Sequence, residues 1–524
     1  RAEHSRNVVA IDAFGRRPAP GRDSAVGLSM PVWTYAASAF VFSILVSAGL
    51  TYLLVGWSLR LRLVAQPRAD RWHGKTTPNT GGLAILIASA GGYCLFAWGQ
   101  YPAIALCGAF VSLLGFLDDR VPLRPLAKFA GQSAAVVAVI ANGVVFHATP
   151  WASFNLALTF LWIAGITNAF NLIDNIDGLC AGVAVIICGS RFVVALQNPD
   201  PGGAMVLAVL AGSVSGVLIF NRKPARIFMG DCGSLFLGFS LWARAIASPV
   251  PNTRVFVSTL FYPALAFLYP IFDTVLVAVL RRCAGRPISI GGRDHSSHRL
   301  VSLGVTERKT VWLLWLLAAI GASAGLVSYA MPMGVLVIAV LLIGGVSVLG
   351  IFLATLPAYL LPETAPVRAR WIRRATPNLR AGLTLIVDTL LAGVALLAAF
   401  LVRWENVFLG PPLHQFLLSL PVLMGFHALA SVAFRTFDCG WRWFGVRDLF
   451  ALGRSTAAGS AASICALWFL GMRGYSRGVI LLYVFLVLAF TAGLRLSMRF
   501  LWQTLGMPVG ARRAAVLGVN GATE

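Results

Sequence analysis

The sequence has little negative charge, few lysines and no closely paired cysteines. Its 524 residues include 19 acids against 42 basic residues, and only four of the basic residues are lysine. The eight cysteines form no C-x-x-C pair and most lie within apolar runs, so neither a disulfide framework nor a zinc site is expected. No cleavable signal peptide is apparent either, because the first apolar run follows a long polar stretch and is itself long enough to span a membrane.

Apolar residues are what the sequence has in excess. Hydrophobic residues make up 58% of the chain and charged residues 12%, which is typical of a polytopic membrane protein. The formal net charge of +23 would suggest nucleic-acid binding in a soluble protein. Here the cations fall between the apolar runs, so they indicate membrane topology and attraction to anionic lipid and phosphate groups, with no nucleic-acid partner.

Runs of about 20 apolar residues recur along the chain, and each is long enough to cross a bilayer. The first set is expected near 32–57, 81–98, 103–117, 126–146, 152–169, 179–197, 203–220, 233–249, 255–280, 310–329 and 332–357. The second set is expected near 381–402, 413–434, 451–471 and 477–502. The prediction is an all-α polytopic membrane protein with about 11 transmembrane helices, followed by about four further helices.

The loops between the runs alternate in charge. Basic residues follow the first, third, seventh and ninth runs, whereas other loops, such as 197–203 and 248–252, are short and nearly uncharged. The positive-inside rule places the basic loops in the cytoplasm, with the amino terminus outside and the carboxyl terminus inside. Every polar motif described next falls on this cytoplasmic side.

The polar stretch 168–179 lies between two apolar runs. Asn168, Asn171, Asp174 and Asp177 follow one another at intervals of three residues, so successive side chains would be neighbours on a helix. Acids and amides at this density beside hydrocarbon are costly to bury, and they indicate a binding site. The alternative is a hydrophilic loop with an aspartate cap.

Two adjacent acids, Asp118 and Asp119, close the third run. Because neighbours on a helix point about 100° apart, only one of them is expected to face a site directly. Neighbouring carboxylates suit a proton acceptor. The alternative is a helix end that is merely anchored at the membrane interface.

A glycine-containing segment, 228–234, leads into the eighth run. Gly230 and Gly233 flank Asp231 and allow close backbone approach, and the start of the following helix favours an anion. Because Mg²⁺ prefers one or two carboxylates together with phosphate oxygens, Asp231 is suited to hold Mg²⁺ against a diphosphate.

The loop after the ninth run contains His295 and His298 between Arg293 and Arg299. Imidazoles bracketed by guanidinium groups make a phosphate-binding surface. Zinc is the competing interpretation, although no cysteine or further histidine accompanies the pair. Asp273 lies within the ninth run, where an acid either serves function or pairs with a neighbouring arginine.

These residues describe a site on one membrane face, suited to a reaction between a water-soluble diphosphate and an anionic lipid. An ion-coupled secondary transporter is the alternative function, and Asp273 and the many apolar runs would support it. Transporters place their acids near the bilayer midplane and often contain internal repeats. Here the acids gather at one surface and no repeat is apparent, which favours the enzyme.

Over about residues 32–357 the chain resembles the polyprenyl-phosphate N-acetylhexosamine-1-phosphate transferases, which include the WecA-type initiators of surface polysaccharides and the translocase of peptidoglycan synthesis. The motifs that carry the resemblance, in family order, are Thr77-Pro78, Gly81-Gly82, Asp118-Asp119-Arg120, Lys128, Gln132, the stretch 168–179, Asn221, the segment 228–234 and the loop with His295 and His298. The resemblance implies transfer of an N-acetylhexosamine 1-phosphate from a UDP-sugar to polyprenyl (undecaprenyl) phosphate, with release of UMP. It also implies Mg²⁺ as cofactor, with Mn²⁺ as an alternative, a bacterial inner membrane and a homodimer.

Carried onto this sequence, the resemblance implies roles for individual residues. Asp231 and Asn171 would contact Mg²⁺ and the diphosphate, and Asp118 or Asp119 would deprotonate or position the lipid phosphate. The other implied site residues are Asp174 and Asp177, which would shape the site, Lys128 for phosphate, Phe228 for stacking on uracil with Asn221 beside it, His295 and His298 for the sugar nucleotide, and Asn168 and Arg293. The translocase has three successive histidines where this chain has His-Ser-Ser-His, which favours a smaller amino sugar than a muramyl pentapeptide.

From about residue 381 the chain resembles the membrane anchor of capsule-type nucleotide-sugar dehydratases and epimerases, on Arg435 and residues 441–444 and 447–449. A Rossmann domain follows that anchor, and residues 512–522 are similar to its first strand and glycine turn. The predicted organisation is a flexible segment at 1–30, a transferase domain at 31–360, a basic cytoplasmic linker at 361–380, a four-helix anchor at 381–505 and the start of a Rossmann domain at 506–524.

Overall fold

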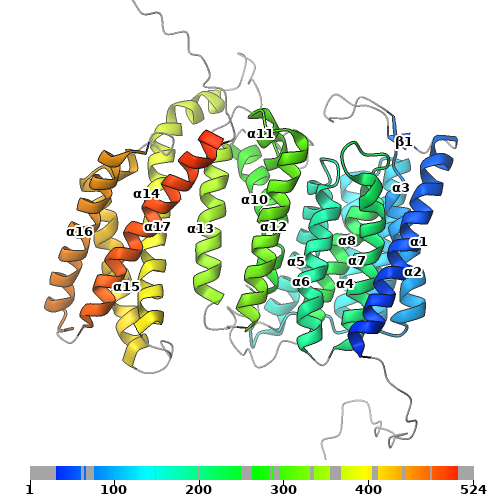
Figure 1. The fold of residues 1–524 in the computed structure, drawn as a ribbon, viewed down its shortest axis with the longest axis horizontal. Helices are drawn as coiled ribbons and strands as arrows, with labels where there is room; N and C mark the ends of the chain where they lie inside the picture. The colour runs from blue at the N-terminus through cyan, green and yellow to red at the C-terminus, as the bar shows by residue number, and fades with distance from the viewer. Residues whose placement is uncertain are drawn as a thin grey trace, which may run out of the picture.

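The computed structural model describes residues 31–60, 64–65, 76–147, 149–198, 200–248, 262–283, 286–287, 292, 294–330, 335–354, 367–403, 411–438, 444–472 and 475–504. Within these residues the chain is mostly helical (Figure 1), which confirms the all-α prediction. The flexible segment predicted at 1–30 and the start of a Rossmann domain predicted at 506–524 lie outside the described residues.

The helices of the first part follow the predicted apolar runs. Their bounds are α1 (Val32–Arg60), α2 (Gly81–Phe96), α3 (Pro102–Arg120), α4 (Pro125–Ala141), α5 (Ala152–Ile173), α6 (Leu179–Gln197), α7 (Pro201–Asn221), α8 (Gly230–Ala247), α10 (Leu268–Cys283), the short α11 (Ser296–Ser302), α12 (Glu307–Ala330) and α13 (Val335–Ala354). A short antiparallel pair, β1 (Val64–Ala65) with β2 (Thr77–Pro78), lies beside the start of α2.

The second part of the chain forms a bundle of its own. Its elements are α14 (Val367–Arg403), α15 (Pro411–Ala433), the turn η2 (Thr436–Asp438), α16 (Val446–Phe469) and α17 (Arg477–Thr504). Figure 1 shows these yellow to red helices at one side, with α13 between them and the first bundle. Each bundle has a separate apolar core. Because α14 begins at Val367, most of the basic segment predicted as a linker at 361–380 is helical.

Eight of the described helices are long and apolar enough to cross a membrane. The protein is therefore a multi-pass membrane protein. The larger predicted number of spans includes segments outside the described residues, such as the first part of the run at 255–280, and stays a prediction.

The polar stretch 168–179 is a helix end followed by a tight turn. α5 continues to Ile173, four residues beyond the predicted end at 169, and Asp174 is its C-cap. Gly178 then takes a left-handed conformation, with φ at 80°, immediately before α6 begins, a conformation that glycine adopts without steric cost. Asn168 and Asn171 thus lie on the last turns of α5, and Asp177 lies in the turn.

The starts of α2 and α8 touch through their backbones. The amide of Gly81 donates to the carbonyl of Phe228 at 2.9 Å, and that of Gly82 donates to Met229 at 2.9 Å. A Cβ atom on Gly82 would lie 2.2 Å from the backbone nitrogen of Gly233. Only glycine therefore fits at position 82, and the contact fixes the segment that precedes α8.

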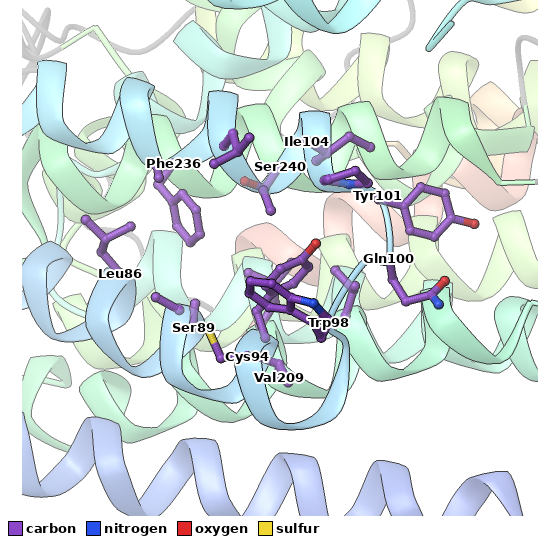
Figure 2. A pocket seen from close by; sticks show the side chains of 18 of the residues that line it. Leu86, Ser89, Cys94, Trp98, Gln100, Tyr101, Ile104, Val209, Phe236 and Ser240 are labelled. Atoms are coloured by element: carbon purple, nitrogen blue, oxygen red, sulfur yellow. The ribbon is translucent and has the colours of Figure 1, made fainter. Parts of the chain in front are cut away.

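An apolar cavity of about 430 Å³ lies at the opposite end of α2 and α8. Figure 2 shows part of its lining, with Phe236 of α8 on one side and Trp98 and Tyr101 of the α2–α3 turn on the other. The two charged groups nearby, Asp200 and Arg244, pair with each other, and Asp200 also accepts from the hydroxyl of Tyr101 at 2.8 Å. This cavity is therefore lined mainly by apolar side chains, and the clustered acids lie elsewhere.

The second bundle contains a buried ion pair that we expect to stabilise it. Arg495 of α17 donates from Nη1 and Nη2 to the two carboxylate oxygens of Asp388 of α14, at 2.9 and 2.8 Å. Replacing Asp388 by leucine leaves the arginine buried without its counter-ion, so we expect a loss of about 3–5 kcal/mol. The measurement is the thermal unfolding temperature of the purified protein in detergent.

The matched control is the double variant Asp388→Leu with Arg495→Leu. Replacing both partners by apolar side chains removes the uncompensated charge, so its unfolding temperature should return close to that of the wild type. A single variant as stable as the wild type would show that the ion pair does not hold α14 against α17.

Candidate active site

A cavity of about 270 Å³ lies where α3, α5 and α7 end and where α6, α8 and α12 begin. It brings together most of the predicted site residues, although they come from distant parts of the chain. The predicted residues that line it are Asp119, Asn171, Asp174, Asp177, Asn221, Phe228, Asp231, His295 and His298. Its polar lining and its place at the end of the helices make it the candidate active site.

Asp231 lies at the centre of a charged cluster. One carboxylate oxygen accepts from Nδ2 of Asn171 at 2.8 Å, and the other accepts from Nζ of Lys128. Lys128 also reaches Oδ2 of Asp118 at 2.9 Å. Two carboxylates thus share a single ammonium group. Asp231 lines the cavity, whereas Lys128 and Asp118 lie behind it, with Lys128 in contact with Asp231.

Asp118 and Asp119 have different partners, as their spacing on the helix predicts. Asp119 accepts from the backbone amides of Asp231 at 3.2 Å and Cys232 at 3.1 Å, and from Nδ2 of Asn79 at 2.9 Å. The first amides of a helix have no partner within it, so Asp119 satisfies the start of α8. Asp118 instead faces Lys128.

Two predicted asparagines have structural partners, and one of them joins two backbone segments. Asn221 accepts from the amide of Gly178 at 3.0 Å and donates to the carbonyl of Ile227 at 2.8 Å. It therefore joins the start of α6 to the segment that carries Phe228. Asn168 donates to Oε1 of Gln132 at 2.8 Å and does not line the cavity.

The partner of Asp273 is a histidine rather than an arginine. Its buried carboxylate lies 2.8 Å from Nδ1 of His295 and accepts from the backbone amide and the hydroxyl of Ser296 at 2.7 and 2.6 Å. The predicted alternative of an arginine partner is wrong, because Arg281 pairs with Asp294 at 3.0 Å. Asp273 therefore fixes the orientation of the His295 ring.

Three residues of the cavity were not predicted from the sequence. Asn79 directly follows the Thr77-Pro78 motif and precedes Gly81-Gly82 by two residues. A polar side chain between these two motifs was a signal that could have identified it. Asn175 accepts from the hydroxyl of Ser297 at 2.6 Å, and Glu307 pairs with Lys223. No spacing pattern marks these last two. Arg293, which was predicted, lies outside the described residues.

The donor set at Asp231 fits a Mg²⁺ ion that a substrate helps to bind. Among the described residues no three His, Cys, Asp or Glu side chains are grouped as a metal site. Mg²⁺ usually keeps several waters and takes one or two carboxylates together with phosphate oxygens. The side chain of Asp231 is 29% exposed and Asn171 lies beside it, so these two residues would hold the ion.

Comparison with known proteins identifies the family. The model of glycosyl transferase family 4 matches residues 101–248. The probable undecaprenyl-phosphate N-acetylglucosaminyl 1-phosphate transferase of Bacillus subtilis (strain 168) is 33% identical over 304 residues, which cover 55% of this chain and 84% of that relative. The chain belongs to glycosyl transferase family 4.

Other relatives extend the range of substrates named for such proteins. The decaprenyl-phosphate N-acetylglucosaminephosphotransferase of Mycolicibacterium smegmatis is 31% identical over 353 residues, covering 57% of this chain and 86% of the relative. The phospho-N-acetylmuramoyl-pentapeptide-transferase of Desulforamulus reducens is 28% identical over 326 residues, which cover 56% of this chain and 95% of that relative. Membership of family 4 favours the transferase prediction over the transporter.

Asp119 should matter for stability because it satisfies the start of α8. Asp119→Ala removes the acceptor of two backbone amides, and loss of such a cap costs about 0.5–2 kcal/mol. We expect the thermal unfolding temperature to fall by a measurable amount. The matched control is Asp119→Asn, which keeps one acceptor oxygen and should lose less. Equal unfolding temperatures for the alanine variant and the wild type would contradict the capping role.

Proposed function

We propose that this protein transfers an N-acetylhexosamine 1-phosphate from a UDP-sugar to polyprenyl phosphate and releases UMP. The observation that carries the proposal is the cluster of Asp231, Asn171, Lys128 and Asp118 beside a polar cavity, in a member of family 4. The names of the relatives support sugar-1-phosphate transfer to a polyprenyl phosphate. We place the reaction at the cytoplasmic face of a bacterial inner membrane, where it would initiate cell-surface glycan synthesis, because the basic loops lie on that side.

The cavity would bind the sugar nucleotide. Phe228 lines it and would stack on the uracil, while Asn221 holds the backbone on either side of that position. His295 and His298, with ring centres 6.0 Å apart, would contact the sugar or its phosphate, and Asp273 fixes the orientation of His295. Bound Mg²⁺ would offset the negative charge of the diphosphate.

Asp118 is better placed than Asp119 to act on the lipid phosphate. Asp119 is occupied by two backbone amides and by Asn79, whereas Asp118 accepts from one backbone amide, that of Leu123 at 2.7 Å, and pairs with Lys128. In the proposed reaction an oxygen of polyprenyl phosphate attacks the β-phosphorus of the UDP-sugar. The bond between this phosphorus and the oxygen bridging to the α-phosphate breaks, and UMP leaves. Asp118 would accept a proton from the lipid phosphate, and Lys128 would hold its oxygens.

The bundle from α14 to α17 would be a membrane anchor for a sugar-modifying enzyme. Its separate apolar core is the support for treating it as an independent unit. In this proposal a dehydratase or epimerase domain is tethered beside the transferase that uses its product. A homodimer, which the family resemblance implies, remains a prediction.

Turnover should require both Mg²⁺ and the carboxylate of Asp231. UMP release from UDP-N-acetylglucosamine is measured with purified protein and undecaprenyl phosphate, with and without Mg²⁺. Asp231→Asn should lower the metal-dependent rate at least about 100-fold, because the ion loses its only charged protein ligand in this proposal. Release that needs neither lipid nor metal would contradict the proposed reaction.

The matched control for Asp231→Asn is Asp448→Asn. Asp448 is also an acid in the first turn of a helix, but it lies on α16 in the other bundle. Its substitution should leave UMP release unchanged. If neither UDP-N-acetylglucosamine nor any other UDP-amino sugar yields UMP with folded protein, the transferase proposal fails and the transporter alternative returns.

The transferase should work without the second bundle. A chain that ends at residue 360 keeps the apolar core of the first bundle and every residue of the candidate active site. We therefore expect UMP release within about twofold of the full chain, measured at equal amounts of monodisperse protein. Complete loss in a well-folded truncated protein would show that the two bundles share one site.

A further inference from the structure

A second, larger cavity opens at the same end of the first bundle as the candidate active site. Its volume is about 940 Å³, and it lies along α7, between α1 and α12. Figure 1 shows α6 and α7 between α12 and α1, and the helix contacts agree, because α7 packs against α1 and α6 while α6 packs against α12. None of the residues proposed to act on the lipid phosphate lines this cavity.

One end of the cavity carries a group of cations. Arg222 and Arg226 follow the end of α7, and Arg308 lies in the first turn of α12. All three side chains are exposed, and none forms an ion pair with another residue that the structure describes. Three guanidinium groups around one opening make a surface for a phosphate group.

The rest of the cavity is apolar and follows the helices away from the cations. A Cβ atom on Gly212 would lie 2.4 Å from the carbonyl of Phe40, and one on Gly216 would lie 2.8 Å from that of Ile44. Phe40 and Ile44 therefore lie beside those glycines, roughly 15 and 9 Å along the helix axis from Arg222, at 1.5 Å per residue. The cavity thus extends from the charged surface into the depth of the hydrocarbon.

Aromatic and aliphatic side chains mark where the cavity meets the membrane. Trp312 is 68% exposed and Ile219 is 48% exposed, although both line the cavity. Tryptophan is enriched where hydrocarbon meets the polar headgroups of lipids. The opening therefore faces lipid laterally, and its cations lie at headgroup depth.

An ion-paired wall separates this cavity from the candidate active site. Asp177 lines both cavities, and Lys223 lies between Asp177, at 3.8 Å, and Glu307. The amide of Ala225 also donates to Asp177 at 3.0 Å. Asp231 lines only the candidate active site and not this cavity, which argues against polyprenyl phosphate as the occupant.

We propose that this cavity binds an anionic glycerophospholipid of the surrounding membrane. Its phosphate lies among Arg222, Arg226 and Arg308, and its acyl chains lie along α1 and α7. Cations between transmembrane helices at one membrane face are the sites where anionic lipid headgroups bind. The site is independent of the proposed reaction, because it is defined by charge and shape alone.

The test measures how much phosphatidylglycerol the full-length protein retains. Protein is reconstituted in phosphatidylcholine vesicles with and without phosphatidylglycerol, extracted in mild detergent, and its bound lipid is counted by native mass spectrometry. The triple variant Arg222→Gln, Arg226→Gln and Arg308→Gln should bind phosphatidylglycerol at least about tenfold more weakly, since each basic residue near the surface contributes to attraction of anionic lipid.

The matched control changes the same net charge at the same end of the bundle. Arg60, Arg124 and Arg282 are exposed and lie outside the cavity, so their triple glutamine variant should retain phosphatidylglycerol as the wild type does. Equal losses in the two triple variants would overturn the proposal in favour of general attraction to a basic surface.

Two further arms test the shape and the source of the lipid. Ser215→Phe keeps every charge but fills the apolar part of the cavity, and it should also reduce retention. Polyprenyl phosphate added in excess should leave the phosphatidylglycerol bound. Displacement by polyprenyl phosphate would overturn the assignment to a glycerophospholipid, and retention by the filled variant would overturn the placement of its chains.

Discussion

The start of α8 is the constraint on which the site depends. Its first amides are unpaired within the helix, and Asp119 of α3 accepts from two of them while the start of α2 binds the backbone just before them. A buried amide without an acceptor is costly, so these contacts hold α2, α3 and α8 together. Asp231 is held on this junction, and the other polar residues gather around a carboxylate that is already fixed.

Much of this arrangement could be predicted from the sequence. Apolar runs mark the helices because hydrocarbon demands about 20 apolar residues for each span, and acids beside such runs mark the site because they are costly to place there. Asn171, Asp174, Asp177 and Asp231 were predicted on that basis and line one cavity. These residues could be recognised from the sequence because they are polar and lie next to apolar runs.

The partnerships between these residues could not be predicted in the same way. Which of Asp118 and Asp119 faces the cavity depends on the rotation of α3 against α8, and no local pattern encodes it. For Asp273 the sequence left a functional role and an arginine partner as alternatives, and only the packing of α10 against α11 brings it to His295. Glu307 lies in the first turn of α12, where an acid is favourable in any helix. The sequence therefore does not distinguish a cavity residue from an ordinary acid at this position.

The glycine contact between α2 and α8 holds the backbone that precedes Asp231 at a fixed distance from α2. At Gly82 there is no space for a Cβ atom beside Gly233, so every other residue type would force the two helices apart. The position therefore requires glycine for steric reasons, and a residue without a side chain supplies no group for a chemical step. A larger residue at position 82 would therefore displace the backbone that carries Asp231, so loss of activity in such a variant would report a shifted helix and not a missing chemical group.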